Sequence, residues 1–110
     1  MEIDLNKEQD TIVIAVKGRM DAVCATDFDQ TLEEKINDGE CSFILDFSSL
    51  EYISSAGLQC ILAAAKNLEN NKGRIKLAAL KGTVKEVFEI AGFDTMFSIY
   101  ESVDEALQAK

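Results

Sequence analysis

Histidine, proline and tryptophan are absent from this sequence, and its 20 acidic residues outnumber its 11 basic ones. Without histidine, the usual base of a Ser-His-Asp hydrolase is missing. The sequence also lacks a GxSxG elbow and a glycine-rich phosphate loop, two common marks of acyl and phosphoryl transfer. We therefore expect no catalytic residues and no enzymatic activity.

The excess of acidic residues disfavours partners that are themselves anionic. At a formal charge of −9, nucleic-acid phosphates and anionic lipids would both repel the chain on average. No apolar run approaches the ~20 residues of a membrane span, and the N-terminus lacks the basic and apolar regions of a signal peptide. We expect a cytoplasmic protein with no nucleic-acid partner and no direct membrane insertion.

Cysteine is scarce as well. Cys24, Cys41 and Cys60 are an odd number at wide spacing, without the CxxC pair that would indicate a zinc or redox site. No acidic cluster at loop spacing indicates an oxygen-ligated metal. The sequence therefore predicts no metal and no other cofactor, and it favours small buried thiols in a reducing compartment.

What is present is typical of one globular domain. The length of 110 residues suits a single core. An apolar fraction of 47% beside 28% charged residues predicts a chain that folds. No repeat, low-complexity segment or linker divides residues 1–110, so we expect a single domain.

The first half of the chain predicts a hairpin, a helix, a strand and a second helix. Alternating apolar residues in 3–7 and 11–17 indicate a β-hairpin, followed by a loop at 19–21. A spacing of four predicts a helix over 26–38, and the apolar run 41–47 predicts a central strand covered on both faces. After a loop at 46–54, the pattern from Ser55 is helical to about residue 70.

The second half continues the alternation. It predicts a strand at 75–79, a helix at 84–91, a strand at 96–100 and a terminal helix around 103–107. A β-α-β-α-β-α order gives parallel strands with helices packed on the sheet, while the hairpin adds antiparallel pairing. The fold class is therefore α/β, with a mixed sheet flanked by about four helices.

The turn at residues 54–57 is the favoured functional location, because loops at the carboxyl ends of parallel strands line the functional crevice of such sheets. Either serine could simply cap the helix, by accepting a bond from an unpaired backbone N–H. Ala56 and Gly57 are small and would let another molecule approach, although Gly57 could instead pack tightly near Asp21.

The outer side of the helix that follows leaves two possibilities open. Cys60, Ala63 and Ala64 occupy positions that should face water on a surface helix. Either this helix is more buried than a surface helix, or its outer side is an interaction patch.

These residues carry a resemblance to a known family. The segment FILDFSSLEYISSAGLQCILAAAK, residues 43–66, resembles the signature region of STAS domains, specifically the stand-alone anti-sigma factor antagonists of bacteria. GRMD, residues 18–21, is similar to the family's Gly-x-hydrophobic-Asp. The resemblance extends over essentially the whole chain and implies a single STAS domain over residues 1–110.

The resemblance implies a partner-switching protein that regulates transcription. In that family the unmodified antagonist binds an anti-sigma factor that is also a serine kinase, and sigma factor is released. Phosphorylation of a serine in the strand-to-helix turn inactivates the antagonist, and a serine phosphatase restores it.

The resemblance also assigns roles to residues of this chain. Ser55 matches the phosphorylation site, with Ser54 as second choice, and Asp46 matches the aspartate that ends the central strand. Asp21 matches an acidic residue beside the serine. Many relatives carry aspartate where this chain has Ser54. The partner-binding residues that we expect are Asp21, Ser54, Ser55, Ala56, Gly57, Leu58 and Gln59.

Two other functions remain open. A STAS subunit of a lipid-transport ATPase or a sensory complex would dock through the same surface without a kinase, and Ser54 in place of aspartate favours it. A nucleotide-binding sensor would use the helix N-terminus for phosphate, although no basic residue is near the turn. The exposed apolar residues leave the oligomeric state as monomer or weak dimer.

Overall fold

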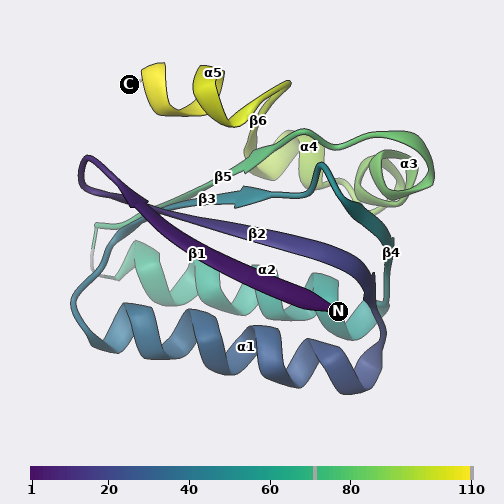
Figure 1. Ribbon diagram of the computed structural model, residues 1–110, viewed down its shortest axis with the longest axis horizontal. Helices are drawn as coiled ribbons and strands as arrows, with labels where there is room; N and C mark the ends of the chain where they lie inside the picture. The colour runs from purple at the N-terminus through teal and green to yellow at the C-terminus, as the bar shows by residue number, and fades with distance from the viewer. Residues whose placement is uncertain (71, 110) are drawn as a thin grey trace.

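The computed structural model describes residues 1–70 and 72–109. Over these residues a six-stranded sheet is combined with five helices (Figure 1). The strands are β1 (Glu2–Glu8), β2 (Thr11–Met20), β3 (Ser42–Asp46), β4 (Leu50–Ile53), β5 (Arg74–Ala78) and β6 (Ser98–Tyr100). The helices are α1 (Ala22–Asn37), α2 (Ser55–Glu69), α3 (Gly82–Ile90), α4 (Phe93–Met96) and α5 (Val103–Gln108).

The sheet is mixed, as predicted. Its order is β1-β2-β3-β5-β6, and β4 pairs with the end of β2. β1 runs antiparallel to β2, and the other pairs are parallel. Figure 1 shows α1 and α2 side by side on one face of the sheet and α5 on the opposite face.

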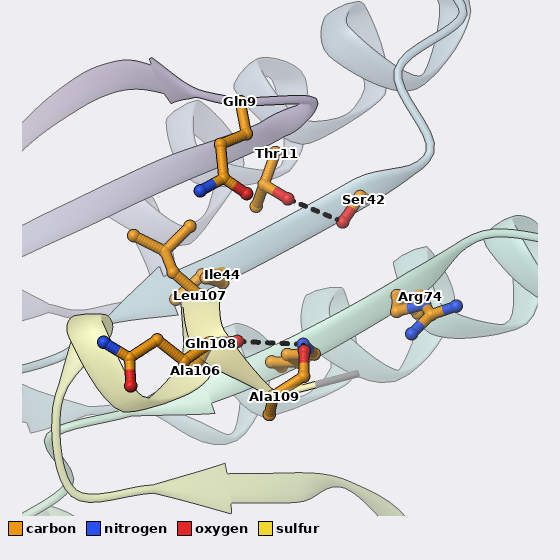
Figure 2. Close-up of a pocket in the computed structure, with 10 residues that line it drawn as sticks. Gln9, Thr11, Ser42, Ile44, Arg74, Ala106, Leu107, Gln108 and Ala109 are labelled. Atoms are coloured by element: carbon orange, nitrogen blue, oxygen red, sulfur yellow. Dashed lines mark hydrogen bonds between the residues drawn. The ribbon is translucent and has the colours of Figure 1, made fainter.

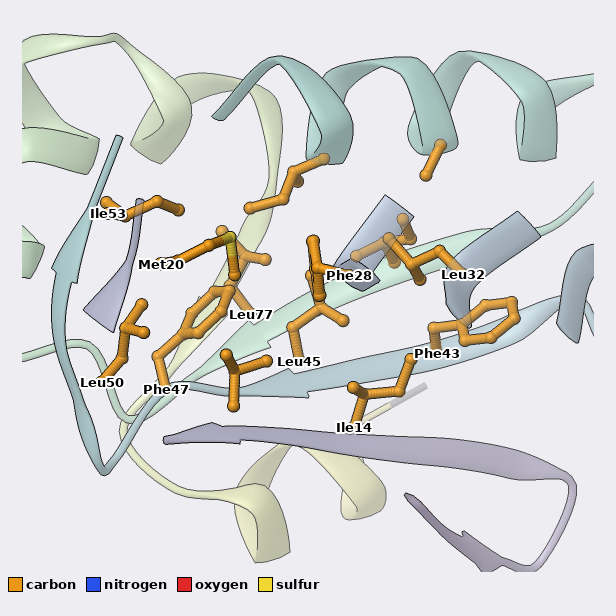
Figure 3. Packing of buried hydrophobic residues seen from close by; sticks show 14 of the residues in the cluster. Ile14, Met20, Phe28, Leu32, Phe43, Leu45, Phe47, Leu50, Ile53 and Leu77 are labelled. Atoms are coloured by element: carbon orange, nitrogen blue, oxygen red, sulfur yellow. The ribbon is translucent and has the colours of Figure 1, made fainter. Parts of the chain in front are cut away.

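The core follows the alternation of the strands. On β3, Phe43 and Leu45 point into the large cluster beneath α1 and α2, shown in Figure 3. Ile44, between them, joins a smaller cluster with Val13 and Ala106 under α5. Both faces of β3 are therefore covered, which confirms the prediction of a central buried strand.

Two boundaries near the first helix differ from the sequence prediction. Arg19 and Met20 lie in β2 rather than in a loop, because β4 continues the pairing of β2 beyond the end of β3. α1 begins at Ala22 rather than at Thr26, since Asp21 caps it there. The apolar spacing that starts at Phe28 marks only the buried part of this helix.

β4 lies inside the segment predicted as a loop. Its four residues contribute two buried and two exposed side chains, a pattern too short to indicate a strand. Within the part of the chain that the structure describes, its backbone pairs only with β2, at Gly18, Arg19 and Met20. A tertiary contact therefore creates this strand.

The last predicted strand is shorter than expected. Met96 belongs to the one-turn helix α4, and β6 starts at Ser98. Phe93 explains the extra turn, because its ring packs 5.2 Å from Phe88 and 5.3 Å from Phe97, centroid to centroid. The remaining helices and strands occur in the predicted order.

Candidate functional site

Two strand-to-helix junctions lie side by side at one end of the sheet. Met20 and Ile53 are partners in the parallel pairing of β2 and β4. The backbone N–H of Ser54 also donates to the carbonyl of Met20, at 2.9 Å. The N-terminal ends of α1 and α2 are therefore neighbours, and Asp21 and Ser54 are the first residues beyond the paired strands.

Ser54 is the N-cap of α2. Its backbone is extended, with φ −85° and ψ 167°, and its hydroxyl oxygen accepts from the N–H of Gly57 at 3.2 Å. The side chain is half-buried. The capping role foreseen for one of the two serines therefore belongs to Ser54.

Ser55 is the first residue of α2 and is exposed. Its hydroxyl makes no hydrogen bond with any other part of the chain that the structure describes. The backbone N–H groups of Ser55 and Ala56 belong to the first turn, where an α-helix leaves its donors without helical acceptors. Ser55 thus combines an available hydroxyl with nearby free donors.

Gly57 is buried beneath this turn. A Cβ atom at this position would lie 2.7 Å from Met20 Sδ and 2.8 Å from Ile53 Cγ1. The absence of a side chain therefore lets α2 approach the ends of β2 and β4 closely, which matches the tight-packing interpretation of Gly57. Leu58 packs half-buried against the core, whereas Gln59 is exposed.

Asp21 is the N-cap of α1. Its carboxylate accepts from the N–H of Cys24 at 2.8 Å, and this bond holds the pKa of Asp21 below its usual value. Among residues 1–70 and 72–109, no hydrogen bond joins Asp21 to Ser54 or Ser55. The carboxylate therefore lies at the neighbouring helix end, with capping as its observed role.

Asp46 ends β3, as predicted from the resemblance, and its role is also local. Its carboxylate accepts from the N–H of Ser48 at 3.0 Å. This bond fixes the chain where it leaves β3 and turns toward β4. Asp46 therefore supports the path into the site.

The outer side of α2 is more buried than that of an isolated surface helix. Cys60 donates its thiol proton to the carbonyl of Ala25 on α1, at 3.6 Å, and Ala64 is 6% exposed. Burial raises the pKa of the Cys60 thiol. Of the three positions, Ala63 is the one that is exposed to solvent. Contact with α1 therefore accounts for most of this apolar side.

The cysteines are free thiols. Cys24 and Cys60 are half-buried, but Cys41 is exposed, contrary to the prediction that all three are buried. Cys41 lies just before β3 begins, where the chain has not yet entered the covered sheet.

Two apolar side chains beside the turn escaped the sequence analysis. Val23 is 80% exposed in the first turn of α1, and Tyr52 is 40% exposed on β4. The guanidinium of Arg19 lies 4.5 Å from the centre of the Tyr52 ring. Tyr52 fell in the predicted loop, and only a helix start at Ala22 reveals Val23 as an outward-facing residue.

Neither a metal site nor a membrane span is indicated among the described residues. No group of three or more His, Cys, Asp or Glu side chains in the described ranges could hold a metal ion. None of the helices described is long and apolar enough to cross a membrane.

The architecture defines a class of single-sheet α/β domains in which two helices start side by side at the ends of parallel strands. The STAS domain family model matches residues 2–106. The chain belongs to the STAS domain family.

Curated relatives carry names from sigma-factor regulation. The chain is 34% identical to BtrV of Bordetella bronchiseptica, named as a candidate anti-sigma factor antagonist, over 99% of this chain and 94% of that protein. It is 23% identical to the anti-sigma-F factor antagonist RsfB of Mycobacterium tuberculosis, over 86% of this chain and 77% of RsfB.

Solved structures share the fold. A candidate anti-sigma factor antagonist from Thermotoga maritima superposes with a TM-score of 0.91 at 21% identity, covering 96% of this chain and 92% of that one. The Bacillus cell fate determinant SpoIIAA in its phosphorylated form gives a TM-score of 0.78 at 23% identity, covering 96% of both chains.

Proposed function

We propose that this protein is a cytoplasmic anti-sigma factor antagonist controlled by phosphorylation of Ser55. In its unmodified form it binds an anti-sigma factor that is also a serine kinase, and this releases the sigma factor. The kinase inactivates the antagonist by phosphorylating it, and a serine phosphatase reverses the modification. The protein itself performs no catalytic step. Its family membership and the names of its relatives support this function.

One observation carries the choice of Ser55. The two adjacent hydroxyls have different surroundings, since Ser54 is half-buried and accepts from the N–H of Gly57, whereas Ser55 is exposed with its hydroxyl unused. A kinase would have to reach a half-buried oxygen of Ser54 that the N–H of Gly57 already engages. Phosphorylation of Ser55 breaks no bond that the described structure contains, so Ser54 remains the second choice.

The position of Ser54 also accounts for the departure from the aspartate of many relatives. Serine and aspartate are both strong N-cap residues, because each places a side-chain oxygen near the N–H three residues on. The exchange keeps the cap and removes one negative charge beside Ser55. It therefore gives no reason to prefer constitutive docking in a transport or sensory complex.

The fold should tolerate a phosphate on Ser55. At a helix N-terminus the free N–H groups and the helix dipole favour an anion by about 0.3 to 1 kcal/mol. A phosphoserine carries about −1.5 to −2 charge. The switch would then act between proteins, where a docked partner would strip water from this charge.

The docking surface that we propose surrounds this hydroxyl. Asp21, Ser55 and Gln59 are exposed, and Ala56 and Leu58 are partly accessible between them. Val23 in the first turn of α1 and Tyr52 on β4 add exposed apolar area. Gly57 contributes through the close packing that shapes the turn. Aromatic side chains such as Tyr52 are enriched at protein interfaces relative to the rest of the protein surface.

Affinity measurements with the cognate anti-sigma factor kinase test the proposal. We expect Ser55→Asp to fold normally and bind 10² to 10³ times more weakly, a difference of roughly 3 to 4 kcal/mol, while Ser55→Ala binds constitutively. Gln30→Glu is the matched control, because it adds one negative charge on exposed α1 away from the turn. Equal affinity of wild type and Ser55→Asp, with both folded by circular dichroism, would contradict the proposal.

Intact mass spectrometry of protein from its native host separates switching from constitutive docking. We expect one phosphate, removed by phosphatase, mapped to Ser55 and lost in Ser55→Ala. Ser54→Asp should retain it. Absence of the phosphate under all growth conditions would favour constitutive docking.

A further inference from the structure

A polar hollow lies at the end of the sheet opposite Ser55. It has a volume of about 410 Å³ and is open to solvent beside α5 (Figure 2). Thr11, Ser42 and Arg74 are the first residues of β2, β3 and β5. β2 has ten residues, and at about 3.3 Å per residue it separates this hollow from the Ser54–Ser55 turn by roughly 30 Å.

Hydrogen-bond donors dominate the lining. The hydroxyls of Thr11 and Ser42 lie 3.0 Å apart, and because one proton serves that bond, the other hydroxyl proton remains available. Gln9 and Gln108 contribute carboxamides from the hairpin and from α5. Figure 2 shows these side chains arranged around the opening.

Two cations complete the lining. The Lys76 ammonium donates to the carbonyls of Ala106 at 2.9 Å and Ala109 at 2.8 Å, which leaves one of its three N–H groups. The guanidinium of Arg74 has no acidic partner within ion-pair distance in the part of the chain described. Arg74 therefore offers a planar cation whose side-chain N–H groups have no partner among the described residues and can bind a ligand.

No carboxylate side chain from residues 1–70 or 72–109 lines the hollow, in a chain with 20 acidic residues. The neighbouring Glu40 is paired with Lys7 at 3.0 Å, so its charge is already compensated. Among the described lining residues the two charged side chains, Arg74 and Lys76, are both positive, which contrasts with the negative net charge of the protein.

We propose that the hollow binds a small soluble phosphate monoester with a hydroxyl-bearing body. The planar guanidinium of Arg74 binds the phosphate through two parallel N–H donors, and the remaining Lys76 N–H adds a second cationic contact. Thr11, Ser42 and the two carboxamides bind the hydroxyl groups. The volume lies within the usual range of about 300 to 1,000 Å³ for small-molecule sites.

Titration of the full-length ¹⁵N-labelled protein with ribose 5-phosphate tests this site. We expect saturable shifts of backbone amides in 9–11, 42, 74–76 and 106–109, and a weaker effect of inorganic phosphate. Arg74→Gln should weaken binding by roughly tenfold or more, because a charge-assisted bidentate contact is lost. Lys85→Gln removes the same charge from the exposed face of α3 and should bind as wild type.

Several outcomes would overturn the proposal. Equal effects of ribose and ribose 5-phosphate would show that the phosphate group is not recognised. Equal affinity for inorganic phosphate and ribose 5-phosphate would show that the hydroxyl groups do not contribute to binding. Equal loss of affinity in Arg74→Gln and Lys85→Gln would show that binding depends on the net charge of the protein and not on this hollow. Binding to phosphatidic acid vesicles without binding to ribose 5-phosphate would assign a lipid headgroup. Shifts confined to the Ser54–Ser55 turn would place the ligand elsewhere.

Discussion

The junctions that lead from β2 into α1 and from β4 into α2 follow the same plan. Each strand ends on a buried apolar residue, Met20 or Ile53, and the two are paired. The next residue, Asp21 or Ser54, caps the following helix by accepting from the backbone N–H three residues on. Capping alone therefore distinguishes neither junction as functional.

The junctions differ at the first and third helical residues. α1 has Ala22 and Cys24 there, whereas α2 has Ser55 and Gly57. Gly57 is packed against both strand ends, and Ser55 carries a hydroxyl that the fold does not use. α2 therefore has both its cap and a surplus hydroxyl, and Gly57 lets the turn that carries this hydroxyl pack closely against the ends of both strands.

The largest expected effect on stability concerns the third helical residue. Gly57→Ala adds a Cβ within 2.8 Å of two side chains. Overpacking costs about 1 to 3 kcal/mol and alanine regains about 0.5 to 1 kcal/mol of helix propensity. We expect a net loss of about 1 to 2 kcal/mol in urea unfolding. Cys24→Ala, the matching change in α1, should stay within about 0.5 kcal/mol. An unchanged Gly57→Ala midpoint would refute the packing role.

Substitutions at the two serines should have different effects on stability in the same urea unfolding assay. Ser54→Ala removes the cap and should cost about 1 kcal/mol, whereas Ser54→Asp should retain stability at neutral pH. Ser55→Ala should change stability by less than about 0.5 kcal/mol, because no bond is lost. Equal destabilisation by the two alanine substitutions would show that Ser55 also supports the fold.

The charged cap of α1 should make stability sensitive to acid. Because the folded state lowers the pKa of Asp21, the carboxylate contributes stability above its unfolded pKa of about 3.9, and this contribution is lost as pH falls through the folded pKa. Asp21→Asn keeps an N-cap and should lose less stability than wild type between pH 5 and pH 3. Ser54→Asp, which has a second carboxylate cap, should lose more stability than wild type over the same pH range. Urea unfolding curves of each protein at pH 5 and pH 3 measure these losses. A loss of stability in Asp21→Asn equal to that of wild type would contradict the prediction.

The smallest expected effect concerns the thiol at the first junction. A hydrogen bond with Asp21 raises the pKa of Cys24, which lowers its thiolate fraction at neutral pH. Asp21→Asn should therefore speed alkylation of Cys24 by iodoacetamide, followed by mass spectrometry, with the exposed Cys41 as internal reference. A rate that does not change relative to Cys41 would show that the thiol does not sense this carboxylate.

Local sequence determined most of the fold. The apolar run around Phe43 and Leu45 predicted the covered central strand, and the helical spacing after Ser55 predicted α2, because each element's own side chains set its periodicity. The capping alternative for the serines was also visible in the sequence, since serine at a helix start has that chemistry in any fold. The family resemblance pointed to the same turn.

Tertiary contacts decided the rest. β4 exists because the end of β2 offers it a partner, and this pairing brings Asp21 and Ser54 to adjacent helix ends. The same pairing makes Gly57 a packing residue and separates the hydroxyl of Ser54 from that of Ser55. The residues of the polar hollow come from strands far apart in the sequence. Periodicity describes one segment at a time, whereas these features depend on which segments meet.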